Sequence, residues 1–160
     1  MMSKRQAAFR ADYRTKISRF YSGPLHVAVI YAIGFAAIWY FAGHVVNARW
    51  TDWLIVPLAF LGANIFEWWI HRYVMHRPVK GFMGIYKRHT LAHHQFFTDA
   101  EPSVDSNRDF RIVFFPPYAL AAFMAGSIIP AWILGLAGAA NAGWLLLITN
   151  TALYLNYELF

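Results

Sequence analysis

Apolar segments far longer than a soluble core requires alternate with short segments that carry nearly all of the charge. No Asp, Glu, Lys or Arg lies between Arg19 and Arg49. Within this stretch, residues 24–43 form an apolar run of the roughly 20 residues that cross about 30 Å of hydrocarbon as a helix. A run of this length, starting this late and lacking a small-residue cleavage site, predicts a membrane span that stays in the mature protein, not a signal peptide.

Three further apolar runs follow the first. Residues 53–70 end in Trp68 and Trp69, where an interfacial aromatic belt is expected. Residues 112–157 carry no charge over a length too great for one span, and a Gly- and Ala-rich stretch at 138–143 divides them. The pattern therefore predicts an all-α polytopic membrane protein with about four transmembrane helices, at 24–43, 53–70, 112–137 and 142–160.

Composition agrees with a lipid environment. The chain is 59% hydrophobic and 19% aromatic, and only 14% of its residues are charged, against about 25% charged in soluble domains. It has no cysteine, which excludes disulfides, thiolate nucleophiles, Cys-bound zinc and iron–sulfur clusters. The net charge of +6 does not indicate nucleic-acid binding, because the basic residues flank the apolar runs.

The basic flanks predict the orientation. Six basic residues against Asp12 lie in residues 1–19, and five basic residues with no acid lie in residues 71–90. By the positive-inside rule, a basic N-terminal segment (1–22) and a His-rich segment (71–111) are cytosolic, in a bacterial inner membrane or the endoplasmic reticulum. The loops near 44–52 and 138–143 then lie on the opposite side. The basic N-terminus is interpreted as a topology determinant, with contact to anionic lipid as an alternative.

Five of the seven histidines lie between positions 71 and 94, directly after the second span. On an α-helix, His89 and His93 face the same way and His94 lies about 100° round. His71 and His76 are about 140° apart on an ideal helix, so they would serve two metals, or one metal if the helix loosens ahead of Pro78. Because imidazole suits iron, zinc and copper, we predict a metal site. The predicted ligands are His71, His76, His89, His93 and His94.

Two carboxylates lie close to these histidines in sequence. Glu67 is one turn before His71 and is expected to accept its second ring N–H, although it could instead pair with Arg72. Asp99 could act in the same outer shell or lie in a solvated loop. The structural alternative for the five histidines is a solvated juxtamembrane loop.

Residues outside the cluster receive weaker assignments. His26 and His44, one at each end of the first span, are expected to be interfacial polar residues. In the fourth span, Asn150, Asn156 and Glu158 could form hydrogen bonds across helices. Four aromatic residues either line an entry for a lipid tail or simply pack: Phe96, Phe97, Phe114 and Phe115.

The combined motif resembles a known family. EWWIHRYVMHRP (67–78), YKRHTLAHHQFF (86–97) and DFRIVFFPP (109–117) are similar to the first half of the fatty acid hydroxylase superfamily, which includes sphingolipid fatty acid 2-hydroxylases, sterol desaturases and carotenoid hydroxylases. The resemblance covers residues 67–117 by motif. It implies a di-iron centre, with zinc also possible, held by the five histidines on the cytosolic side of a four-helix membrane domain (23–160).

The resemblance also implies an activity and its partners. The expected protein is an O₂-dependent membrane oxidoreductase that hydroxylates or desaturates a fatty acyl chain, a sterol-like lipid or a carotenoid. It would take electrons from a cytochrome b5-, ferredoxin- or flavoprotein-type donor. Because the family carries further His boxes after its last span and this chain has no histidine after His94, we expect the domain to be incomplete at its C-terminus. The alternatives are a non-catalytic metal- or haem-binding membrane protein and an inactive relic of the family.

Overall fold

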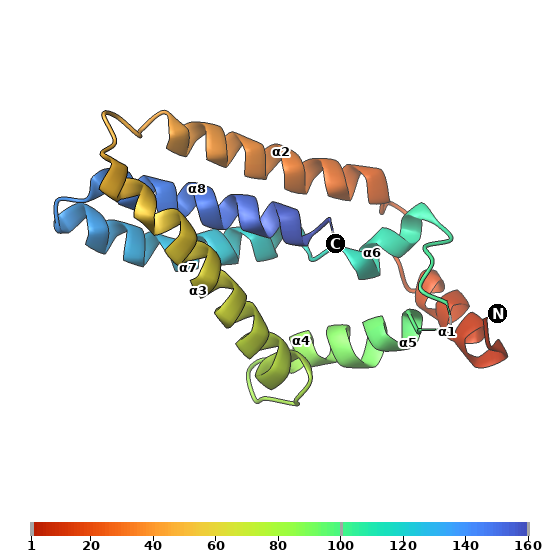
Figure 1. The fold of residues 1–160 in the computed structure, drawn as a ribbon. Helices are drawn as coiled ribbons and strands as arrows, with labels where there is room; N and C mark the ends of the chain where they lie inside the picture. The colour runs from red at the N-terminus through yellow and green to blue at the C-terminus, as the bar shows by residue number, and fades with distance from the viewer. Residues whose placement is uncertain (1, 100, 160) are drawn as a thin grey trace. The chain divides into compact units, whose positions relative to one another are not determined.

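The computed structural model describes residues 2–99 and 101–159, and these residues are helical with no strand among them. The chain forms two compact units, each built from two segments: residues 1–27 with 67–114, and residues 28–66 with 115–160. The helices, in chain order (Figure 1), are α1 (Lys4–Thr15), α2 (Gly23–Ala42), η1 (Trp50–Leu54), α3 (Ile55–Ile70), η2 (His71–Met75), α4 (Met83–Tyr86), η3 (Lys87–His93), α5 (His94–Phe96), η4 (Asn107–Asp109), α6 (Phe110–Val113), α7 (Pro117–Leu136) and α8 (Ala140–Tyr157).

The second unit is organised around α8, whose residues form most of its buried core. Figure 1 shows α2 and α7 running alongside it. The approach is close at two glycines: a Cβ added at Gly143 would lie 2.6 Å from the carbonyl oxygen of Ala131, and one at Gly34 would meet the Leu155 side chain at 2.6 Å. Small residues at these points allow the backbones to pack without lipid or water between them.

Polar groups on α8 are paired within the same unit. The Asn150 amide donates to Ser127 Oγ at 2.9 Å, which confirms the predicted hydrogen bond across helices. Glu158 is buried and accepts from the Phe115 backbone N–H at 3.1 Å, whereas Asn156 is exposed. At the other end of the helix, the Asn141 amide exchanges two hydrogen bonds with the Val46 backbone, at 2.9 and 3.0 Å.

Three helical stretches are long and apolar enough to cross a membrane: Gly23–Ala42, Trp50–Met75 and Asn107–Leu136. They match the first three predicted spans, and most of their large apolar side chains are exposed, as lipid-facing helices require. The third differs from its predicted bounds, because α6 ends before Pro116 and α7 begins with Pro117 in its first turn. The fourth predicted span corresponds to α8. Among the described residues, α8 is not apolar enough to count as a candidate membrane span, because it contains three asparagines.

In the first unit, α1 packs against the segment that follows His89, His93 and His94. Tyr13 meets the Phe96 ring edge-on at 5.5 Å between centroids, and Arg10 is almost fully buried, with 1% of its surface exposed. Arg14 binds both oxygens of Asp109, at 2.7 Å each. The interpretation of the basic N-terminus as a topology determinant alone is thus incomplete, because two of its arginines are bound by the acidic stretch 99–109.

Candidate metal centre

The five histidines form two groups along the chain, His71 with His76 and His89 with His93 and His94. Each group lies on or directly after a helical turn that is wider than an α-helical turn. The turn η2 closes with a hydrogen bond from the His76 N–H to the His71 carbonyl at 3.2 Å, a bond between residues five apart. The turn η3 ends the same way, with the His94 N–H donating to the His89 carbonyl. Such π-helical turns are rare and frequently lie at functional sites. Each π-helical turn brings two residues that are five apart onto one face of the helix. The turn η2 is the loosened helix ahead of Pro78 that the sequence required if His71 and His76 are to share one metal ion.

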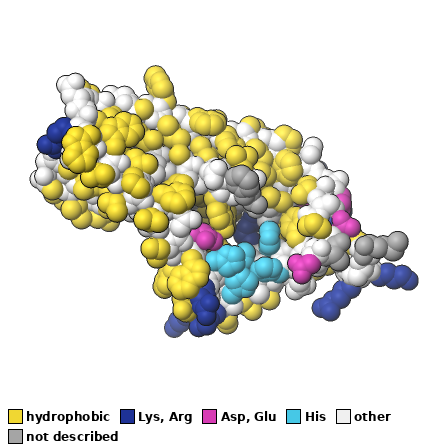
Figure 2. All heavy atoms as spheres, viewed as in Figure 1, with side chains coloured by type: hydrophobic (Ala, Val, Ile, Leu, Met, Phe, Trp, Pro, Cys, Tyr) yellow, Lys and Arg dark blue, Asp and Glu magenta, His cyan; other side chains and the backbone are white. Residues whose placement is uncertain are grey.

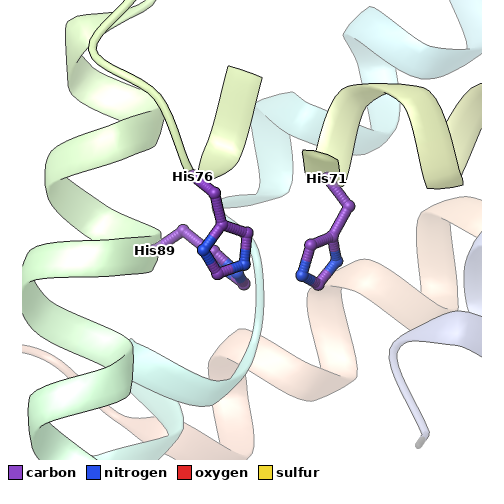
Figure 3. A group of neighbouring side chains, drawn as sticks. All are labelled: His71, His76 and His89. Carbon is purple, nitrogen blue, oxygen red and sulfur yellow. The ribbon is translucent and has the colours of Figure 1, made fainter. Parts of the chain in front are cut away.

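Three imidazoles point toward one another at the centre of the cluster (Figure 3). His71 and His76 stack with centroids 4.7 Å apart, and the His89 ring stands nearly perpendicular to both, at 4.8 and 5.0 Å. One potential ligand atom from each of the three lies within 4.8 Å of the others. Two sequence segments thus supply a preformed set of nitrogen donors that could hold a metal ion.

His93 and His94 extend this group. The His94 ring lies 5.0 Å from His76 and 4.8 Å from His89, whereas His93 stacks on His89 at 5.6 Å. The ring contacts therefore join all five predicted histidines in one cluster, and Figure 2 shows His side chains gathered together at the surface. His94 reaches both groups, while His93 touches only the second.

Outer partners orient two of the rings. His71 Nδ1 lies 3.3 Å from Glu67 Oε1, so the carboxylate takes the first ring nitrogen and leaves Nε2 for a ligand. A His93 ring N–H donates to the Ile112 carbonyl. Asp99 lies exposed in the turn closed by Thr98 and Glu101, and the described residues show no hydrogen bond between it and a histidine. Its outer-shell role stays a prediction.

The environment favours neutral imidazole, the form that binds metal. Burial, followed by the neighbouring His71, lowers the pKa of His89 to about 3. Burial also lowers the pKa of His93, against the hydrogen bond to the Ile112 carbonyl, and that of His94. Protons therefore compete weakly for these nitrogens near neutral pH.

One atom in the cluster fits a bound cation particularly well. His89 Nε2 is buried and has no hydrogen-bond partner among the residues that the structure describes. A buried polar atom without a partner costs about 1–3 kcal/mol, and a metal ion at this nitrogen would remove that cost. The cluster opens on one side into a hollow of about 370 Å³ lined by Glu67, Trp68, His71, Arg72 and His76.

The remaining predicted residues have other environments. Phe96 is fully buried beneath Arg10, and Phe114 packs on His26 and Phe110, so these two contribute to packing. His26 is buried in the first turn of α2, with Nδ1 2.8 Å from the Tyr21 hydroxyl, and its interfacial position stays a prediction. His44 is exposed in the turn after α2, and its Nδ1 bonds the Tyr40 carbonyl in the last turn of that helix at 2.8 Å.

Sequence reasoning missed the contribution of α1 to this region. Gln6 and Arg10 both donate to the carbonyl of Phe96, two residues after His94. The available signal was charge complementarity between an N-terminal segment of excess positive charge and the acidic stretch 99–109.

Comparison of the chain with models of protein families, with curated proteins and with solved structures finds no match.

Proposed function

We propose that this protein is a membrane-bound, O₂-dependent di-metal oxidoreductase of the fatty acid hydroxylase type that hydroxylates or desaturates a lipid. The observation that carries the proposal is the convergence of five imidazoles from two π-helical turns, directly after an apolar helix long enough to cross a membrane. The motif resemblance points to the same chemistry.

His71, His76 and His89 would hold one ion, and His93 and His94 would contribute to the centre from the second turn. When bound, a di-iron centre supplies O₂ activation and oxidation of an unactivated C–H bond. The fit rests on neutral nitrogen donors and on the buried, unpartnered His89 Nε2. Zinc would fit the same donors.

The chain's own part in the reaction is to orient and to shield. Glu67 fixes the ring of His71, and the Ile112 carbonyl fixes that of His93. Trp68 on one wall of the hollow offers an apolar surface beside the cluster, where an alkyl chain arriving from the bilayer would displace water. Arg72 on the same wall would stay at the water boundary.

The proposed topology has the N-terminus and the His-rich segment in the cytosol. It is supported by the hydrogen bonds between α1 and residues 96–109, which require both segments to lie on one side. The bonds between Asn141 and Val46 join the two loops assigned to the opposite side. A fourth crossing by α8, shielded from lipid by its neighbours, completes this arrangement despite its three asparagines.

Electrons for O₂ reduction would come from a donor of the cytochrome b5, ferredoxin or flavoprotein type. Simple metal binding without catalysis is the other function that the cluster alone supports. Haem binding has less support, because haem held between membrane helices would need histidines inside two facing spans, whereas His26 and His44 flank the same span.

The test is lipid profiling of cells with the intact gene, without it, and with a His76→Ala, His89→Ala double variant. The proposal expects a hydroxylated or desaturated lipid that requires the gene, O₂ and both histidines. If the lipid profile is the same in all three strains under aerobic growth, the oxygenase function is wrong and the metal-binding alternative gains.

A further inference from the structure

The N-terminal helix α1 forms hydrogen bonds with the backbone at the end of the turn that carries His93 and His94. Phe96 ends the short helix α5, so its carbonyl has no partner within that helix. Two side chains of α1 fill this need: Gln6 Nε2 donates at 3.0 Å and Arg10 Nε donates at 2.9 Å. Gln6 also donates to the carbonyl of Glu101 at 3.3 Å.

Arg10 is the most constrained residue of this contact. Its remaining guanidinium nitrogens donate to the Glu101 carbonyl at 2.9 Å and to Asp105 Oδ2 at 2.8 Å, and the group lies 4.7 Å above the Phe96 ring. With only 1% of the residue exposed, water cannot replace these partners. A buried charge tolerates few geometries, because every lost partner leaves it uncompensated.

Arg14 secures the far end of the same loop. It binds both oxygens of the fully buried Asp109, and Asp109 Oδ2 accepts from the backbone N–H groups of Asp105 and Ser106 at 3.0 Å. The segment from Phe96 to Asp109 is thereby fixed to one face of α1 at both of its ends.

We infer that α1 is a positioning element of the metal centre, with Gln6 and Arg10 as positioning residues that hold His93 and His94 through the Phe96 carbonyl. This inference rests on the proposed function. Neither side chain touches the histidine rings, but both fix the backbone two residues beyond His94. Metal sites require their ligands to be held within about 0.5 Å of the productive geometry, and a three-residue helix does not supply that precision alone.

The experiment titrates Co²⁺ into the full chain in detergent and follows the d–d absorption band. Gln6→Met and Arg10→Met are compared with wild type, and Arg5→Met is the matched control, because Arg5 is an exposed cation of the same helix. The expected result is a Co²⁺ affinity about 10–100-fold lower in both test variants, as for lost outer-shell partners. Their absorption spectra should also change, while Arg5→Met stays unchanged. Wild-type affinity and spectrum in both test variants would overturn the inference.

A second measurement works without metal. Hydrogen exchange of the Phe97 amide, which donates to the His93 carbonyl at 2.9 Å, should accelerate in Gln6→Met and Arg10→Met but not in Arg5→Met. Unchanged exchange in the test variants would show that α1 does not hold this turn. If wild type binds no Co²⁺, the proposed function fails and the exchange comparison alone decides the role of α1. If Arg10→Met does not fold, both measurements are made on Gln6→Met, which removes no charge.

Discussion

His89 is the residue of the cluster that a bound ion would change most. Its Nε2 atom is buried without a partner, and its ring contacts those of the other four histidines. Because the pKa of His89 is lowered to about 3, the ring is neutral at neutral pH, so one of its nitrogens carries no proton and can bind an ion.

Glu67 provides a graded test at the residue scale. Glu67→Gln weakens the acceptor for the His71 ring, so Co²⁺ affinity should fall roughly 10–100-fold. The loss should be smaller than for His71→Ala, which removes the ligand itself. Both are measured by Co²⁺ titration. Asp99→Asn is the matched control, because it also removes a carboxylate near the cluster but one with no bond to a histidine; equal losses for the two would assign Asp99 the outer-shell role.

The sequence singled out the five histidines that the structure brings together, and their role as metal ligands stays a prediction. A spacing of five places His71 and His76 on different faces of an α-helix, and only the widened turn brings their rings to 4.7 Å. Pro78 was the local feature that favoured such a loosening, and the sequence did not decide whether it occurs. By contrast, Glu67 and His71 are four apart on a regular helix, so their contact followed from spacing alone.

At the scale of elements, α7 and α8 pack with their backbones close together at Gly143. Gly143→Ala would place a methyl group 2.6 Å from the Ala131 carbonyl oxygen, and forcing the helices apart should cost about 1–3 kcal/mol of unfolding free energy. Thermal or denaturant unfolding in detergent measures the change. Gly126→Ala is the control, because nothing lies within 4 Å of an added Cβ there, and alanine favours a helix by up to about 1 kcal/mol. Comparable destabilisation by the two substitutions would contradict the assigned packing.

The contact between α1 and the loop 101–109 should depend on acid. Hydrogen bonds from Arg14 and then Arg10 hold the pKa of Asp105 below its ordinary value of 3.8. A carboxyl with a lowered folded-state pKa contributes stability that is complete above that ordinary value and is lost as pH falls through the lower folded value. The Ser103 hydroxyl also donates to this carboxylate at 3.3 Å, and the Asp109 carboxylate shares the same Arg14 nitrogen with it.

The difference in unfolding free energy between wild type and Asp105→Asn should therefore be constant from pH 7 to about 4 and shrink below it. Denaturant unfolding at several pH values measures this difference. Asp12→Asn is the comparison, since Asp12 pairs only with the exposed Lys16 on its own helix. A difference that already declines between pH 7 and 5 would mean that Asp105 is not held by the arginines.

The contacts of α1 could not be predicted from the sequence. Its contacts join residues about 90 positions apart, such as Arg10 with Phe96, and no periodicity reports a pairing of that separation. The apolar helices, in contrast, were predicted within a few residues, because their length and lack of charge are local properties.

At the scale of the whole molecule, the distribution of charge and contacts predicts a defined topology. The chain has no native cysteine, so a single introduced one reports its own location. Lys80→Cys and Thr51→Cys, both at exposed positions, should be labelled by a membrane-impermeant maleimide from opposite sides, with position 80 on the cytosolic side. Labelling of both from the same side would contradict the assigned crossing by α3.

The central claim is that the five histidines form a metal centre, and the metal content of the full chain purified under mild conditions tests it most directly. Elemental analysis should find iron or zinc at up to about two ions per chain. The ions should be lost in His89→Ala but retained in His44→Ala, with the helical content of both variants unchanged by circular dichroism. A chain that binds no transition metal, or a His89→Ala variant with wild-type metal content, would contradict the account.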